Sequence, residues 1–152
     1  MNLGQVTSLV LGAVGAALGI VNTYVLLNSR RVRLRVTPKS AQLADGAVLT
    51  HPGRLLNSPV MAIEVINLSS FPVTVSGVGL KLRNGSRLAW TEPIFLDGKP
   101  WPRRLEAREA VTAYASIQSL SPIATRAYVQ TDCGEERTGT SRAFREMLRL
   151  VR

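Results

Sequence analysis

The sequence predicts a mainly β protein. It has a single transmembrane α-helix at its N-terminus, an antiparallel β-sandwich of about seven strands and a short amphipathic helix at its C-terminus. Residues 1–29 contain no acidic, basic or histidine side chain. From Arg31 onward, apolar residues recur with a period of two, which is typical of half-buried strands. Turn residues separate these short runs. We therefore expect an anchor over 1–29, a β domain over 30–141 and a helix over 142–152.

The anchor is predicted from residues 6–27, a stretch of mostly apolar residues. As an α-helix it would be about 33 Å long, which matches a hydrocarbon core of about 30 Å. A cleaved signal peptide is one alternative, although residues 1–8 lack the basic start that such peptides carry. A helix buried in the domain is the other, although such a helix is rarely apolar on every face. We expect a membrane-spanning helix.

Basic residues follow the predicted span on one side only, and no acidic residue occurs before Asp45. The positive-inside rule then predicts a single-pass protein of the cell (inner) membrane, with its N-terminus outside and its β domain in the cytoplasm. We expect the basic residues to lie at the anionic inner leaflet. The residues expected there are Arg30, Arg31, Arg33 and Arg35, and Lys39 is a further basic residue on the same side of the span.

Small residues recur along the predicted helix at a spacing of three or four. Gly15 and Gly19 fit the G-x-x-x-G pattern, in which missing side chains allow two helix backbones to approach closely. We therefore expect a helix–helix contact and a homo-oligomer through this face, although membrane helices are rich in Gly and Ala in any case. The expected contact residues are Gly12, Gly15, Ala16 and Gly19.

The first half of the β domain alternates clearly. In residues 31–36 the apolar and arginine side chains alternate, and Pro38 is expected to end the strand. Residues 39–59 are expected to be mostly loop with at most one short strand. The next strand follows, with Met61, Ile63 and Val65 on one face. In residues 71–82 the alternation slips at Ser76-Gly77, which predicts a β-bulge.

The second half contains the strongest turn signal. Asn84-Gly85 between two alternating runs predicts a two-residue hairpin with a type I′ turn. Residues 92–102 are rich in turn residues, and strands are expected within 109–117, 125–131 and 135–141, with a hairpin turn at 132–134. This strand count favours a sandwich of immunoglobulin-like type. The Cys and Trp residues typical of antibody domains are absent, so the strand topology stays open.

The chain ends in a basic amphipathic helix. Phe144, Met147, Leu148 and Val151 recur at helical spacing, and arginines lie mainly on the other face. We weigh three arrangements: docking on the chain's own domain, lying on the anionic inner leaflet, or binding a partner. The arginines that would face the membrane are Arg142, Arg145, Arg149 and Arg152.

The layout resembles that of small, uncharacterised, membrane-anchored immunoglobulin-like proteins of bacteria and their phages. The similarity lies in the Gly-rich helix and basic strand, and in the stretches VINLSSFPVTVSGVGL, PRRLEAREAVTAYAS and RAYVQTDCGEERTG. In this resemblance Asn67 and Pro72 shape a turn and residues 132–136 form a hairpin. The family implies a fold and an anchor, and no activity or functional residues.

No catalytic constellation is evident in the sequence. The single cysteine, Cys133, and the single histidine, His51, would need to meet to form a dyad, and they cannot build the usual zinc sites. We therefore expect no enzyme and no metal or cofactor. The net charge of +9 permits nucleic acid, lipid or acidic protein partners. Few aromatic residues interleave with the basic ones, so nucleic acid is the least favoured.

Two function classes remain from the sequence. The first is a membrane-anchored interaction or scaffold module that presents its β domain to an unknown protein partner. The second is a structural component of a membrane-linked assembly, such as a phage-encoded virion or assembly protein.

Overall fold

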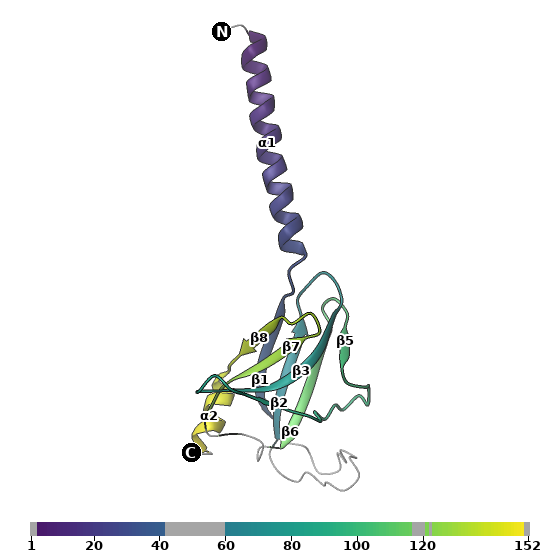
Figure 1. Ribbon diagram of the computed structural model, residues 1–152, viewed down its shortest axis with the longest axis vertical. Coiled ribbons are helices and arrows are strands. Elements are labelled where there is room, and N and C mark those ends of the chain that lie inside the picture. The colour runs from purple at the N-terminus through teal and green to yellow at the C-terminus, as the bar shows by residue number, and fades with distance from the viewer. Residues whose placement is uncertain (1–2, 42–59, 117–120, 122, 151–152) are drawn as a thin grey trace. The chain divides into compact units, whose positions relative to one another are not determined.

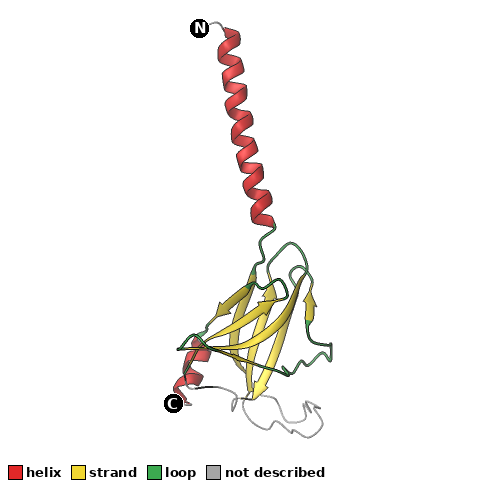
Figure 2. Cartoon of the chain, viewed as in Figure 1, coloured by secondary structure: helices red, strands yellow, loops and turns green. Residues whose placement is uncertain are grey.

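The computed structural model describes residues 3–41, 60–116, 121 and 123–150. The chain divides into two compact units, Met1–Arg31 and Val32–Arg152. The first unit contains helix α1 (Leu3–Ser29), and the second is mainly β with one short helix (Figures 1 and 2). The prediction of an apolar N-terminal helix followed by a β-rich unit is therefore confirmed.

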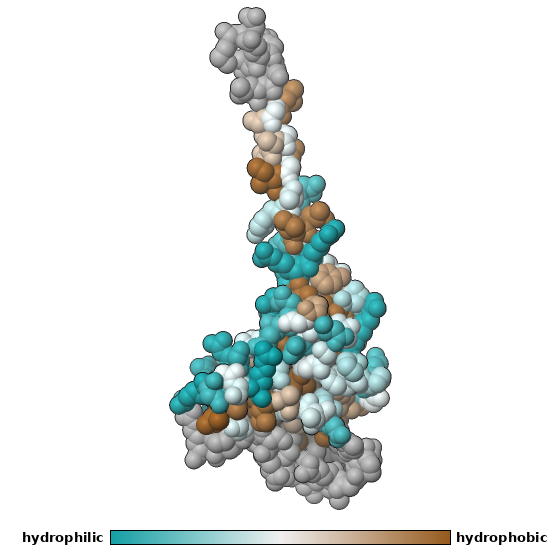
Figure 3. Space-filling view, viewed as in Figure 1, coloured by the Kyte–Doolittle hydropathy of each residue, from teal (hydrophilic) through white to brown (hydrophobic). Residues whose placement is uncertain are grey.

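Helix α1 has no acidic residue in its first turn and no basic residue in its last. Its segment Leu11–Ser29 is long and apolar enough to be a candidate membrane span, and no part of this segment is buried. A signal sequence passes the same test of length and composition. In Figure 3 the described part of this helix is mostly brown to near-white, which marks apolar and small residues.

The first sheet contains β1 (Leu34–Ala41), β2 (Val60–Asn67) and β6 (Ala110–Ser116), in the order β1-β2-β6. Both pairs are antiparallel. In the register, Val65 lies opposite Val36 on one side and opposite Val111 on the other. Because side chains alternate across a strand, all three of these valines point to the same face. All three are buried.

The second sheet is built around β3 (Val73–Leu82). Its order is β4-β3-β7-β8, and β5 pairs with the first part of β3. All of its pairs are antiparallel. The described residues thus form eight strands, where about seven were expected. The remaining strands are β4 (Arg87–Ala89), β5 (Arg103–Leu105), β7 (Ala124–Thr131) and β8 (Glu136–Gly139).

One apolar core is shared by residues of both sheets. The alternation seen in the sequence places one face of each central strand in this core, as predicted for β2 and β3. The slip at Ser76-Gly77 is confirmed, because the β3–β7 register shifts between Val75 and Gly77. The bulge keeps residues on both sides of it pointing inward. Core residues include Met61, Ile63, Val65, Val75, Val78, Leu80, Leu105, Ala127 and Val129.

The turn between β3 and β4 differs from the predicted type I′ hairpin. Gly85 has a φ of 86°, but Asn84 does not share a positive φ. The Gly85 N–H donates to Leu82 O at 3.0 Å, and the Leu82 N–H donates to Ser86 O at 2.9 Å. This is a three-residue loop that ends in a glycine bulge. The hairpin predicted at 132–134 is confirmed and repeats these bonds, with Gly134 at a φ of 84°.

The prediction that Pro38 ends the first strand is wrong, because β1 continues to Ala41. The Pro38 carbonyl accepts a hydrogen bond from the Ser141 hydroxyl, which lies outside the first sheet. The N and C=O of one strand residue point to the same side, so the Pro38 nitrogen also faces away from β2. At the edge of a sheet this position requires no N–H donor, and proline is tolerated there.

Helix α2 (Arg142–Leu150) packs against β1, which confirms the first of the three arrangements considered for it (Figure 1). Ser141 caps the helix, because its hydroxyl accepts the Phe144 N–H at 3.0 Å. Phe144, Met147 and Leu148 are buried in the shared core. These side chains are therefore not available for insertion into a membrane.

Several predictions lie outside the described residues. The loop expected at 39–59 overlaps β1 at its first three residues, and residues 42–59, including His51, are not described. Val151 and Arg152 are likewise outside the described part of the chain.

A close approach between β8 and β1 generates a test of this packing. A Cβ added at Gly139 would lie 1.7 Å from Val36 O, which is a backbone atom that cannot move alone. We expect Gly139→Ala to lower the free energy of unfolding by about 2 kcal/mol or more. Thr140→Ala, at the exposed next residue, should change it by less than about 0.5 kcal/mol. Urea unfolding followed by circular dichroism measures both, and equal stability of the two variants would contradict this packing.

Candidate functional site

The predicted contact face of α1 is exposed. Gly12, Gly15, Ala16 and Gly19 are all exposed, and a Cβ built on any of the three glycines meets nothing within 4 Å. No contact among the described residues therefore requires glycine at these positions. The Thr23 hydroxyl donates to Gly19 O at 2.8 Å, so its polar group is satisfied within the helix. A shallow groove on this unit is lined by Ala16, Gly19, Ile20, Thr23, Tyr24 and Leu27.

The basic residues expected at the membrane surface form two separate groups. Arg30, Arg31, Arg33 and Arg35 are exposed around the start of β1. Arg142, Arg145 and Arg149 are exposed on α2, where Glu146 accepts a hydrogen bond from Arg142 at 2.9 Å. Ser141 binds β1 at Pro38, three residues along the strand from Arg35, the nearest member of the first group, which is about 10 Å. The structure therefore does not join the two groups into one cluster at that contact.

A row of three cations crosses the outer face of the second sheet. In the register, Lys81 on β3 lies directly opposite Arg87 on β4 and Arg126 on β7. Like charges in directly opposite positions destabilise a sheet. Glu136 on β8 balances two of the three, since it lies 2.9 Å from Lys81 Nζ and 2.7 Å from Arg87 Nη2. Within the described residues, no ion pair balances Arg126.

Tyr128 lies beneath these long side chains. Its neighbour across the sheet is Gly79, and the Arg87 guanidinium carbon lies 5.8 Å from the centre of its ring. The ring is only 3% exposed although it points away from the core. Burial raises the pKa of the Tyr128 hydroxyl, Arg87 lowers it and Glu136 raises it further, and the net pKa is above its ordinary value. The phenol is therefore neutral at physiological pH, and we assign it no acid–base role.

A second polar network surrounds the loop that follows β2. Asn67 is fully buried, and its Nδ2 donates to Phe71 O, Leu105 O and Glu106 O at 2.9–3.1 Å. Its Oδ1 accepts the Ser69 N–H at 2.9 Å. This confirms that Asn67 shapes a turn, and Pro72 follows that turn as an exposed residue.

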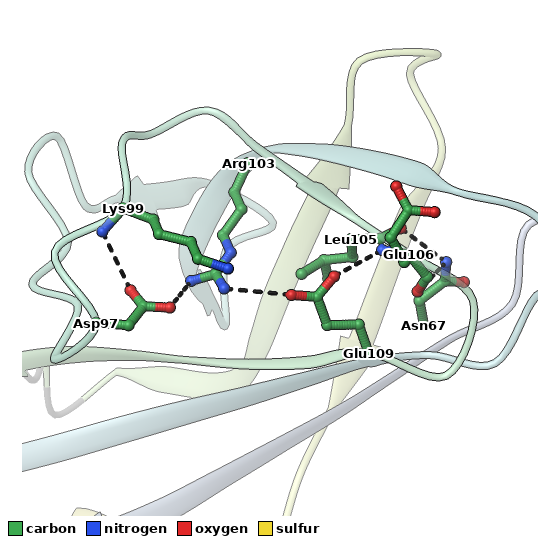
Figure 4. A network of polar contacts seen from close by, with 7 residues as sticks. All are labelled: Asn67, Asp97, Lys99, Arg103, Leu105, Glu106 and Glu109. Atoms are coloured by element: carbon green, nitrogen blue, oxygen red, sulfur yellow. Dashed lines mark hydrogen bonds and ion pairs between the residues drawn. The ribbon is translucent and has the colours of Figure 1, made fainter.

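Arg103 on β5 completes this network, and its side chain is only 7% exposed (Figure 4). Its guanidinium lies between the carboxylates of Asp97 and Glu109. Partial burial alone raises the pKa of Asp97, but the hydrogen bonds from Arg103 and from the Lys99 N–H outweigh it, and the pKa is lowered. For Glu109, the Glu106 N–H and Arg103 likewise lower the pKa. Arg103 pairs with both Asp97 and Glu109, so this network braces the loops.

The remaining chemistry is sparse. Cys133 is exposed in the β7–β8 turn, with its Sγ 3.0 Å from Thr131 Oγ1. His51, the residue that would be needed to form a dyad with it, lies outside the described residues. Among the described residues, no group of three or more His, Cys, Asp and Glu side chains is placed to hold a metal ion.

Sequence reasoning missed the row of Arg87, Lys81 and Arg126. Lys81 and Arg87 flank the predicted hairpin turn, but Arg126 is distant in the sequence, and only the strand register places it beside Lys81. Their common signal is a basic residue at an outward position of each strand. That signal predicts which face of the sheet a residue lies on, but not which residues of the adjacent strands lie beside it.

No known protein-family model matches the chain, and no curated protein matches it.

The Asn67 network yields a stability prediction. Asn67→Ala removes the side-chain partner of three carbonyl oxygens and one N–H, most of them buried or partly buried. We expect the free energy of unfolding to fall by about 2–4 kcal/mol. Asn84→Ala is the control, since it deletes a single exposed bond to the Ser86 N–H and should cost less than about 1 kcal/mol. Equal costs in urea unfolding would show that Asn67 does not organise the loop.

The helix face yields a second prediction. If Gly15 and Gly19 lie in a helix–helix contact, replacing both with Ile should weaken self-association in a membrane reporter assay by on the order of 1 kcal/mol. The matched control replaces Ala13 and Ala17 with Ile, which introduces the same two side chains on another face of α1. Unchanged output for Gly15→Ile with Gly19→Ile, or an equal loss in the control, would reduce the pattern to helix composition.

Proposed function

We propose that this protein is a membrane-anchored, non-enzymatic interaction module that presents a β domain at the cytoplasmic face of the cell membrane. The observation that carries the proposal is the pairing of two units. The first unit is an uncharged helix whose segment Leu11–Ser29 is not buried, and the second is a β unit with its own apolar core. A helix of this kind requires an apolar medium, and a β unit with its own core requires none.

We further propose that the β unit is an immunoglobulin-like sandwich. Two antiparallel sheets that share one core support this assignment. One sheet has three strands and the other has five, with β5 paired to β3. Strands that follow one another in the sequence, such as β2 and β3, therefore lie in different sheets. Such domains serve widely as binding modules, so the assignment by itself names no partner.

Non-catalytic binding is favoured because the buried polar side chains serve one another. The Asn67 amide donates to a loop carbonyl, and the Arg103 guanidinium donates to two carboxylates, all within the same domain. The unbalanced charges lie on outer faces, where they act on a partner or a lipid surface rather than on a bound substrate. We propose anionic lipids as one partner, through Arg30, Arg31 and the neighbouring basic residues.

The orientation follows from the same residues. The first basic side chain after the span is Arg30, and the part before the span carries none. Residues 1–29 therefore bring no charged side chain into the bilayer, whereas the basic residues after them favour the cytoplasmic side. We therefore propose that the N-terminus lies outside and the β domain in the cytoplasm.

Fractionation of cells tests the anchor and its orientation. We expect the full chain with a C-terminal tag to stay in the membrane pellet after alkaline carbonate washing, and the tag to resist protease added to spheroplasts. Leu18→Arg with Val21→Arg should release the chain, because each arginine at the helix centre costs about 3 kcal/mol. Leu18→Ile with Val21→Ile is the matched control and should remain in the pellet.

Two results would contradict the proposal. Release of the unsubstituted chain by carbonate would show that α1 does not span. Digestion of the tag from outside would show that the β domain is not cytoplasmic.

A further inference from the structure

We propose that the free edge of β4, together with the cation row Arg87–Lys81–Arg126, binds an extended acidic segment of a partner protein, which adds to the second sheet as a further strand. The inference deepens the proposed function and rests on it, since it names a surface of the same module and the chemistry of its partner.

The backbone of β4 is open on one side. The strand lies at the end of the order β4-β3-β7-β8. The Leu82 N–H donates to Ser86 O and the Trp90 N–H donates to Val78 O, both at 2.9 Å, which sets the phase of the β3–β4 ladder. Hydrogen-bonded and non-hydrogen-bonded pairs alternate along an antiparallel ladder. Because Leu82–Ser86 and Val78–Trp90 are hydrogen-bonded, the pairs Lys81–Arg87 and Gly79–Ala89 are not. The N–H and C=O groups of Arg87 and Ala89 therefore point away from β3, and no described residue pairs with them.

The side chains of β4 specify what an added strand would carry. Arg87 lies on the outer face of the sheet. Leu88 lies opposite the buried Leu80, so it faces the core side, yet it is 37% exposed and no strand among the described residues covers it. Directly opposite positions in an antiparallel pair interact most strongly. An added strand would thus place acidic residues beside Arg87 and apolar residues beside Leu88, which is an alternating acidic and apolar pattern.

The charge balance favours an acidic occupant. Lys81, Arg87 and Arg126 lie in one row, and among the described residues Glu136 pairs with Lys81 and Arg87 while no acid pairs with Arg126. Arg83, in the loop that leads into β4, is exposed as well. An acidic segment beside β4 would lie next to Arg87 and would reduce the net positive charge of the row. Such complementarity speeds association and rejects basic competitors.

Two other polyanions fit this surface less well. Single-stranded nucleic acid is held by exposed aromatic side chains on which bases stack, and Tyr128 is covered at 3% exposure. A lipid headgroup would bind the cations but would not pair with the outward N–H and C=O groups of β4. Both alternatives are outcomes of the test.

The test uses the full chain in nonionic detergent micelles and a fluorescent synthetic peptide in which Glu and Val alternate. We expect saturable binding that weakens as salt rises. A peptide of the same composition with its acids clustered, and one with Lys in place of Glu, should bind at least roughly tenfold more weakly.

Three variants separate strand addition from general attraction. Arg87→Glu should weaken binding by roughly tenfold or more. Arg145→Glu makes the same charge change at an exposed site on α2 and should leave binding unchanged. Ala89→Pro removes only an N–H that faces outward, which an edge strand tolerates, and it should weaken binding as Arg87→Glu does. Unchanged thermal unfolding of the micellar chain confirms that each variant is folded.

Absence of binding would overturn the proposal. Equal losses in Arg87→Glu and Arg145→Glu would reduce the effect to net charge. Full binding by Ala89→Pro would show that no strand is added. Tighter binding of single-stranded DNA, or displacement of the peptide by anionic lipid mixed into the micelles, would assign the row to those polyanions. None of these results depends on whether α1 spans a membrane, so failure here and failure of the anchor are distinguishable.

Discussion

The structure depends first on the need of α1 for an apolar medium. Nine large apolar or aromatic side chains on its described part are more than half exposed. Each is worth about 1.5–3 kcal/mol when removed from water, so together they amount to well over about 10 kcal/mol. One partner helix packed along the Gly15–Gly19 face would cover a single stripe and leave the others in water. A lipid bilayer would cover every face at once, which is why we propose that α1 is a membrane anchor for the β unit.

In the β unit, the edge strand β1 is covered by other elements of the same domain. Gly139 brings β8 within contact of Val36, and Ser141 binds the outward carbonyl of Pro38. Helix α2 then buries Phe144 in the core that both sheets share. The amphipathic pattern of α2 is therefore satisfied inside the domain, and its arginines are left as a charged outer face. By contrast, β4 remains an edge that nothing described in the chain covers.

Local patterns were sufficient for most of the elements. The uncharged run predicted α1, alternation predicted β2 and β3, and the slip at Ser76-Gly77 predicted the bulge, because each depends on neighbours within a few residues. Features that depend on tertiary neighbours could not be read in this way. Proline is acceptable at position 38 only because β1 is an edge strand there, and Asn84 adopts no positive φ because the loop closes over three residues. The burial of Arg103 and the meeting of Lys81 with Arg126 required the strand register.

The central claim is that lipid, rather than protein, covers α1. Amide hydrogen exchange of the full chain, measured by mass spectrometry in lipid nanodiscs and in lipid-free buffer, tests it directly. Peptides that cover residues 11–27 should exchange little over hours in nanodiscs and rapidly without lipid, because exposed helices open readily in water. Peptides from β2 and β7 should be protected in both conditions. Protection of residues 11–27 that persists without lipid would show that protein covers the helix, and it would contradict the membrane anchor.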